Sequence, residues 1–204
     1  MPIDTLVIAT HNQGKVAEFA KLLEGLNITL KSANDFNLPE PPETEETFEG
    51  NALLKARLAC EVTGLPCLAD DSGLTIEALD GAPGIYSARW AETPDGRDFN
   101  IAMQKVHDGV ARTKGGAING TQSACFVATL ALVFPDHSFE VFEGWVDGKL
   151  CWPPRGDKGF GYDPMFIPDG YDITFGEMEP EQKHAMSHRA HAVNKFKNYL
   201  LKHA

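Results

Sequence analysis

The sequence predicts an α/β fold with a mixed β-sheet and flanking helices. Helical and strand patterns alternate through the first half of the chain, which is typical of helices that connect the strands of a sheet. Two apolar segments, 124–134 and 138–145, then follow one another across a short turn, as in an antiparallel hairpin. A mixed sheet accommodates both patterns. The 204 residues are expected to form a single two-lobed domain over 1–204.

The first third of the chain predicts a strand followed by two helices. The apolar run 6–9 (LVIA) predicts a buried strand, and apolar residues at 16–26 have helical spacing. The Pro-rich, acidic stretch 34–46 indicates an exposed loop. Thr47 is suited to cap a second helix, which Gly64 is suited to end. The residues predicted for the inner face of this helix are Leu53, Leu54, Leu58 and Val62.

The remaining elements are predicted from similar patterns. A short strand at 66–69 is expected to end at an Asp-Asp-Ser-Gly sequence, and extended chain continues over 74–79. Residues 98–107 suggest a helix, and 113–121 (TKGGAINGT) a flexible connection. The apolar residues that predict a C-terminal helix are Val193, Phe196, Tyr199 and Leu200.

Composition and charge restrict the classes of partner. The formal net charge is −11 and no run of Lys or Arg is present, which argues against nucleic acid. A small anion can still bind where a few cations or a metal ion converge. The four cysteines form no CxxC pair, so neither a zinc site nor a disulfide is expected. No apolar stretch reaches the ~18 residues that a membrane span needs, and a cytoplasmic protein without a membrane partner is expected.

The first candidate site lies where the first strand leads into the first helix. Backbone N–H groups and the positive end of the helix dipole favour a phosphate there, and Lys15 adds a formal charge. The alternative is an ordinary connection with a surface lysine. A P-loop is disfavoured, because its first glycine and the Ser or Thr after the lysine are missing. The residues of this segment are Thr10, His11, Asn12, Gln13, Gly14 and Lys15.

The second candidate site is the acidic pair Asp70 and Asp71. Neighbouring side chains of an extended chain point to opposite faces, so only one carboxylate need face a ligand. An aspartate at the carboxyl end of a strand is well placed to hold Mg²⁺, which prefers oxygen ligands. The alternative is a solvated turn, since Asp, Ser and Gly are common turn residues.

The third candidate is the glycine-rich stretch 156–164 (GDKGFGYDP). Its glycines allow the backbone to approach a ligand closely, and Phe160 or Tyr162 offers a ring on which a base can stack. The alternative is a glycine-rich hairpin whose aromatic residues anchor it to the core.

A fourth candidate precedes the last helix. His188 and Arg189 place cations at the helix start, where the dipole disfavours them, and an anionic or acceptor-rich ligand would offset that cost. The alternative is a helix capped by Ser187 with solvated cations.

Together and in order, these motifs resemble the inosine triphosphate pyrophosphatase (HAM1-like) family, in particular its bacterial branch. The match runs from about residue 6 to residue 196, and its sequences are ATHNQGK, TFEGNALLKA, LADDSGL, GAPGIYSAR, KGFGYDP and SHR. The resemblance implies an elongated mixed β-sheet whose flanking helices form two lobes around a central cleft, assembled as a homodimer. It implies a Mg²⁺-dependent hydrolase that converts deaminated purine nucleoside triphosphates, such as dITP, ITP and XTP, to the monophosphate and pyrophosphate.

The same resemblance assigns roles to individual residues. The segment from Thr10 to Lys15 would hold the triphosphate, although His11 stands where the family often has a smaller residue such as Gly. Asp71 would be the catalytic carboxylate and a Mg²⁺ ligand, with Glu43 as the second ligand and Ser72 touching substrate. The residues that would surround the base and sugar are Phe160, Gly161, Tyr162 and Asp163, and those that would close over the base are Lys183, His188 and Arg189.

The implied reaction is attack of water on the α-phosphorus, which depends mainly on positioning and charge neutralisation. A carboxylate bound directly to Mg²⁺ is a weak base. Either Asp71 accepts the proton, or it orients the water while Asp70 or Glu43 accepts the proton. Cationic donors over the base would favour the C6 oxygen of hypoxanthine and xanthine over the amino group of adenine.

Two other functions fit part of the pattern. One is a related pyrophosphatase that acts on modified pyrimidine or methylated nucleotides. The other is a nucleotide-binding regulator without catalysis, in which Asp70 and Asp71 beside a triphosphate would be unfavourable unless a metal intervened.

Overall fold

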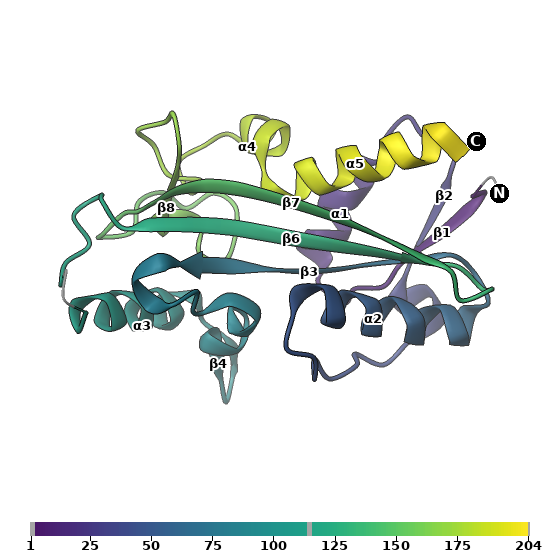
Figure 1. Ribbon diagram of the computed structural model, residues 1–204, viewed down its shortest axis with the longest axis horizontal. Helices are drawn as coiled ribbons and strands as arrows, with labels where there is room; N and C mark the ends of the chain where they lie inside the picture. Colours follow the sequence, from purple (N-terminus) through teal and green to yellow (C-terminus); the bar gives the residue numbers. More distant parts are fainter. Residues whose placement is uncertain (1–2, 114–115, 204) are drawn as a thin grey trace. The chain divides into compact units, whose positions relative to one another are not determined.

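The computed structural model describes residues 3–113 and 116–203 (Figure 1). Residues 114 and 115, within the predicted flexible connection 113–121, lie outside the described residues. The α-helices are α1 (Gln13–Leu22), α2 (Phe48–Thr63), α3 (Phe99–Ala111), α4 (Pro180–Met186) and α5 (His188–His203). The strands are β1 (Thr5–Ile8), β2 (Thr29–Ser32), β3 (Cys67–Ile76), β4 (Glu92–Thr93), β5 (Gly96–Arg97), β6 (Ser123–Val133), β7 (Phe139–Leu150) and β8 (Phe166–Pro168).

The main sheet has six strands in the order β2-β1-β3-β6-β7-β8. Strand β1 runs parallel to both β2 and β3, whereas β7 and β8 are antiparallel. The predicted α/β class with a mixed sheet and flanking helices is therefore confirmed. The predicted hairpin is present as well, since the Phe134 amide donates to the Ser138 carbonyl (2.9 Å) across the turn between β6 and β7.

The chain divides into two compact units. The first lies within 1–71, 128–144 and 189–204, and the second within 72–127 and 145–188. Strands β3, β6 and β7 give residues to both units. The expectation of a single domain over 1–204 stays a prediction.

In the first unit, α1 and α5 lie on one side of the strands and α2 on the other (Figure 1). Alternate strand residues pack against these two sets of helices. One cluster joins Leu6 and Leu68 to Phe19 of α1 and Val193 of α5. A second cluster joins strand residues of the other face to α2, and its strand members include Val7, Cys67, Ala69 and Ala131. This period of two follows from the pleat of the strands. Asp70 therefore shares a face with Leu68, and Asp71 shares one with Ala69.

Helix α2 has the predicted ends, but only part of the predicted inner face is buried, where Leu53 is 8% exposed. Thr47 accepts a hydrogen bond from the Gly50 amide, and Gly64 closes the helix in a left-handed conformation (φ 65°). Leu58 and Val62 are 41% and 68% exposed, so the prediction that they are buried is wrong. Smaller side chains form the buried face because they let the helix approach the sheet closely. The buried residues of α2 are Asn51, Ala52, Leu53, Ala56, Ala59 and Cys60.

Strand β3 continues through the acidic pair, which corrects the predicted end of the strand at Asp70. The pair lies in the middle of β3, and both carboxylates are buried, 2% and 4% exposed. The solvated-turn alternative is therefore wrong. The chain can stay extended here because Leu68 and Leu74 are buried on either side and, as shown below, cations meet both carboxylates.

The second unit packs around its own core. Ile76 of β3, Val106 of α3, Phe126 of β6 and Phe166 of β8 belong to one buried cluster. Helix α3 begins one residue after the predicted start and ends four residues after the predicted end. The seven-residue helix α4 was not predicted, because it is short and lacks a clear apolar period. Within the described ranges, no helix is long and apolar enough to cross a membrane.

Candidate functional site

The segment from Thr10 to Lys15 forms the connection between β1 and α1. Asn12 caps α1, because its side-chain oxygen accepts from the Lys15 amide (3.2 Å), and the Thr10 hydroxyl accepts from the Asn12 amide (3.3 Å). His11 Nε2 lies 2.7 Å from the Leu38 carbonyl oxygen, and this contact attaches the turn to the loop that contains Leu38. The exposed residues of this connection are Asn12, Gln13 and Gly14. An exposed helix start of this kind can accept a phosphate.

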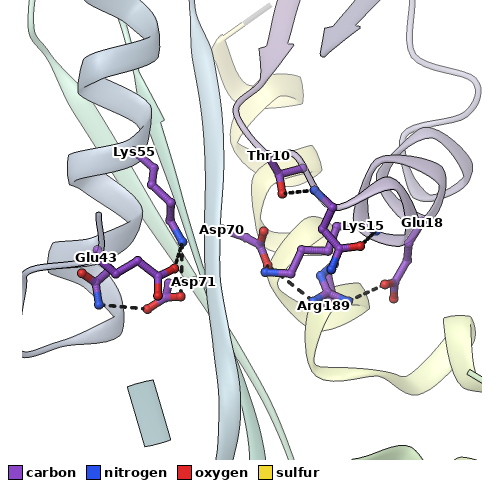
Figure 2. A network of polar contacts seen from close by, with 10 residues as sticks. Thr10, Lys15, Glu18, Glu43, Lys55, Asp70, Asp71 and Arg189 are labelled. Atoms are coloured by element: carbon purple, nitrogen blue, oxygen red, sulfur yellow. Dashed lines mark hydrogen bonds and ion pairs between the residues drawn. The ribbon is translucent and has the colours of Figure 1, made fainter. Parts of the chain in front are cut away.

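Asp70 meets two cations on one side of β3 (Figure 2). Its Oδ2 lies 2.9 Å from Lys15 Nζ and 3.4 Å from Arg189 Nη2, and Arg189 Nη1 also pairs with Glu18 of α1. Burial alone would raise the pKa of Asp70, but the charges of Lys15 and then Arg189 outweigh burial and hold that pKa well below its usual range. Asp70 is therefore a fixed negative charge that anchors Lys15 at the start of α1.

Asp71 points to the opposite side of β3, as the alternation predicts (Figure 2). Its Oδ1 accepts from Lys55 Nζ (3.2 Å), and the same ammonium donates to Glu43 Oε1 (2.8 Å). Asn51 Nδ2 donates to Asp71 Oδ2 (3.3 Å) and to the Glu45 carbonyl (3.3 Å), and Asn51 Oδ1 accepts from the Glu45 amide (3.0 Å). Burial is the main cause that raises the pKa of Asp71, to about 6. The positive charge of Lys55 opposes this rise, and the negative charge of Glu43 adds to it.

The oxygens of Glu43 and Asp71 form a donor pair that suits Mg²⁺. Both converge on one atom, Lys55 Nζ, so a single cation position already exists between them. Mg²⁺ commonly uses one or two carboxylates and completes its shell with water and substrate phosphates. Within 3–113 and 116–203, no group of three or more His, Cys, Asp or Glu residues could hold a metal. The pair thus fits a metal that shares its shell with a ligand.

Lys55 and Asn51 were not predicted as site residues, although both belong to the sequence TFEGNALLKA. The two residues are four apart and so lie on the same face of α2. A buried Asn one turn before a Lys, on the helix that follows an acidic loop, is the signal that could have found them.

Phe160, Asp163 and Lys183 come together in the second unit. Asp163 Oδ2 accepts from Lys183 Nζ (2.5 Å) and from the Phe160 amide (2.8 Å). Lys183 Nζ also lies 4.8 Å from the ring centre of Phe160 and 5.5 Å from that of Phe175. Gly159 has φ 75°, and a Cβ there would lie 2.1 Å from Asp163 Oδ2, so a side chain at 159 would break this arrangement.

Phe160 and Tyr162, the two rings considered for stacking, differ in exposure, and stacking of a base on Phe160 stays a prediction. The Phe160 residue is 42% exposed, whereas Tyr162 is 2% exposed, packs edge-on against Phe99 and donates its hydroxyl to the Ser87 carbonyl (2.8 Å). Stacking by the Tyr162 ring is therefore wrong, because that ring belongs to the core. Between the two rings, Gly161 has φ 71°, which turns the chain from exposed to buried.

The remaining predicted residues lie at the ends of elements or within β3. His188 begins α5 and stacks on Phe126, with ring centres 4.9 Å apart. Ser72 follows Asp71 in β3 and is partly exposed. Arg189 is 1% exposed and bridges Glu18 and Asp70 in the first unit. These two carboxylates offset the cost of a cation at the start of α5, so no ligand is needed to explain Arg189 there. Contact of Arg189 with a base stays a prediction.

The fold and these side chains define a mixed α/β protein with a phosphate-compatible strand-to-helix turn and a carboxylate pair that suits a divalent cation. The chain belongs to the Ham1 family, whose model matches residues 6–199. The family resemblance of the sequence is thereby confirmed.

Individual relatives match nearly the whole chain. A dITP/XTP pyrophosphatase of Ruegeria pomeroyi is 55% identical over 95% of this chain and 93% of its own. One of Rhodospirillum centenum is 56% identical over 93% of this chain and 91% of its own. The solved HAM1 protein of Coxiella burnetii is 37% identical with a TM-score of 0.87, over 99% of this chain and 100% of its own. A structure of a nucleoside-triphosphatase / dITP/XTP pyrophosphatase from Mycobacterium abscessus is 38% identical with a TM-score of 0.75, over 94% and 98%.

Proposed function

We propose that this protein hydrolyses deaminated purine nucleoside triphosphates, dITP, ITP and XTP, to the monophosphate and pyrophosphate, with Mg²⁺ as cofactor. The observation that carries the proposal is the convergence of Glu43 and Asp71 on one cation position, in a chain whose relatives are named dITP/XTP pyrophosphatases. The homodimer and the cytoplasmic location implied by the family resemblance stay predictions.

The first unit supplies the groups that bind phosphate and handle charge. Backbone amides at the start of α1 and the ammonium of Lys15 hold the triphosphate, and Asp70 keeps Lys15 in place. Glu43 and Asp71 would hold a divalent cation, which would supply neutralisation of the phosphate charge. Asp70 pairs with Lys15 and Arg189, which hold its pKa low, so Asp70 is poorly suited to accept the proton from water.

The second unit supplies the groups that select the base. The exposed Phe160 ring offers a stacking surface worth ~1–3 kcal/mol per base. Lys183 donates hydrogen bonds and is held by Asp163, so it favours a C6 oxygen and opposes the C6 amino group of adenine. His188, which is steadied by Phe126, is the second donor of this set.

A substrate panel tests this function. Pyrophosphate release is measured from dITP, XTP, dATP, GTP and dUTP, with Mg²⁺ and with the metal removed by EDTA. Turnover is expected to be highest for dITP and XTP and to disappear with EDTA. Dominant dUTP turnover would instead indicate a pyrimidine enzyme, and binding without turnover or metal dependence would indicate a regulator.

Asp71→Asn tests the site itself. We expect about a 10²–10³-fold loss of kcat, the range found when one charge-stabilising group is removed from an active site, with nucleotide binding largely kept. Asp147→Asn is the matched control, since Asp147 is an exposed aspartate of β7. An Asp71→Asn protein that retains wild-type turnover would contradict the assignment.

A further inference from the structure

The ammonium of Lys55 occupies the cation position between the two carboxylates proposed to bind metal. Lys55 Nζ lies 2.8 Å from Glu43 Oε1 and 3.2 Å from Asp71 Oδ1, and its side chain is 12% exposed (Figure 2). Asp71 is more deeply buried still, with a side chain 6% exposed. A buried carboxylate is unstable without a counter-charge, so the lysine stabilises the pair in the absence of metal.

Asn51 keeps Asp71 and the backbone of the acidic loop in place independently of the lysine. Asn51 accepts from the Glu45 amide (3.0 Å) and donates to the Glu45 carbonyl (3.3 Å), which ties the acidic loop to α2. It also donates to Asp71 Oδ2. Asn51 is fully buried, so it is a fixed part of the core rather than a mobile surface group. Removal of the Lys55 charge therefore leaves Asp71 and the loop that carries Glu43 in place.

We propose that Lys55 is an internal counter-ion that competes with the divalent cation for Glu43 and Asp71, and thereby makes metal binding depend on bound nucleotide. This inference rests on the metal site of the proposed function. It assigns to Lys55 a role that neither the sequence motifs nor the names of the relatives give.

The physical reason is that an ammonium on these two oxygens and a divalent cation brought to the same oxygens repel each other at close range. Metal binding to the free protein must move Lys55 away from both carboxylates and leave a cation without a partner beside a second cation. A triphosphate changes this balance, because it brings several negative charges to which the flexible lysine side chain can turn. The metal and the nucleotide then each strengthen the binding of the other, as linkage requires.

Binding of Mn²⁺ to the nucleotide-free protein tests the competition. Free Mn²⁺ is counted by electron paramagnetic resonance, with Mn²⁺ as the probe for Mg²⁺. Lys55→Met is expected to bind Mn²⁺ at least about fivefold more tightly than the wild type, the lower end of the range for coupled sites. Lys55→Gln gives the same test with a polar side chain should the Met variant fold poorly, and Lys55→Arg should stay near the wild type because it keeps the charge.

Lys15→Met is the matched control for the loss of one positive charge nearby. Lys15 pairs with Asp70, on the other side of β3, and is expected to change Mn²⁺ affinity by less than half as much as Lys55→Met. Equal or weaker Mn²⁺ binding by both neutral variants at position 55 would overturn the proposal. An equally large gain in Lys15→Met would also overturn it, because the effect would then be general charge rather than competition.

The nucleotide dependence is tested with a dITP analogue that has a non-hydrolysable α–β bridge. The analogue is expected to tighten Mn²⁺ binding to the wild type at least about fivefold and to Lys55→Met much less. An unchanged gain in the variant would refute the linkage. Because these measurements need no turnover, they separate the two proposals: inactivity towards dITP and XTP refutes the function, whereas Mn²⁺ binding that ignores Lys55 refutes the counter-ion.

Discussion

Removal of Arg189 should destabilise the protein more than removal of any exposed cation. The guanidinium is 1% exposed and bridges Glu18 and Asp70, whose side chains are 4% and 0% exposed. In Arg189→Met, Lys15 still pairs with Asp70 at 2.9 Å, whereas Glu18 has no other cation within 4 Å among the described residues. The variant thus leaves one carboxylate buried without its counter-charge.

The size of the destabilisation follows from the single carboxylate, Glu18, that loses its counter-charge. Breaking a buried ion pair by removing one partner costs about 3–5 kcal/mol. In a chain of this length each kcal/mol corresponds to roughly 2–4 °C, so the melting temperature should fall by about 6–20 °C. The matched control is Lys158→Met, which removes an exposed pair with Glu179 (38% and 70% exposed) and should cost about 1 kcal/mol or less.

Urea and thermal unfolding, followed by circular dichroism, measure both variants. A second change, Glu18→Leu in the Arg189→Met background, should recover part of the loss, because an apolar pair leaves no buried charge. A free energy of unfolding for Arg189→Met within 1 kcal/mol of the wild type would refute the reasoning, as would a Lys158→Met variant that loses as much.

Three further predictions concern other parts of the chain. Gly159→Ala should lower kcat/KM for dITP, because the new Cβ meets the Asp163 carboxylate; steady-state kinetics that match the wild type would contradict this. Lys183→Met should reduce the preference for dITP over dATP by on the order of 10-fold or more, measured as a ratio of kcat/KM values, while Lys158→Met should leave that ratio unchanged. Burial raises the pKa of the Cys67 thiol to about 12, so at pH 8 only about one molecule in 10⁴ carries the reactive thiolate. Labelling of Cys67 by iodoacetamide should therefore be slow in the folded protein, rise with pH, and become fast in urea. Mass spectrometry of the labelled peptides measures the labelling rate, and a rate in the folded protein equal to that in urea would contradict the prediction.

The fold class could be predicted because its signals are local. Apolar runs, the Thr47 cap and the Gly64 stop appear in the sequence itself and were confirmed. The continuation of β3 through Asp70 and Asp71 could not be seen in this way, since it depends on cations from distant segments that neutralise both carboxylates. Propensity alone treats an Asp-Asp-Ser-Gly sequence as a turn.

The candidate site was predicted in parts. Alternation along an extended chain placed Asp70 and Asp71 on opposite sides, which the structure confirms. Lys55 was missed because a lysine within a helix is ordinarily a solvated residue, and only tertiary packing buries it against Asp71 and Glu43. The sequence suggested that Arg189 binds a ligand, but the structure pairs it with Glu18 and Asp70. No short-range pattern in the sequence connects Arg189 to these two carboxylates.

Strand β3 carries two neighbouring acids with separate partners, and this places an unusual demand on its alignment. Because side chains alternate at every residue, the insertion or deletion of a single residue before Asp70 would exchange the two carboxylates between the Lys15 side and the Lys55 side. Single substitutions can adjust either side independently, whereas a change in length would disturb both together. Related chains should therefore differ in β3 by substitutions alone, and insertions and deletions should be confined to the loops.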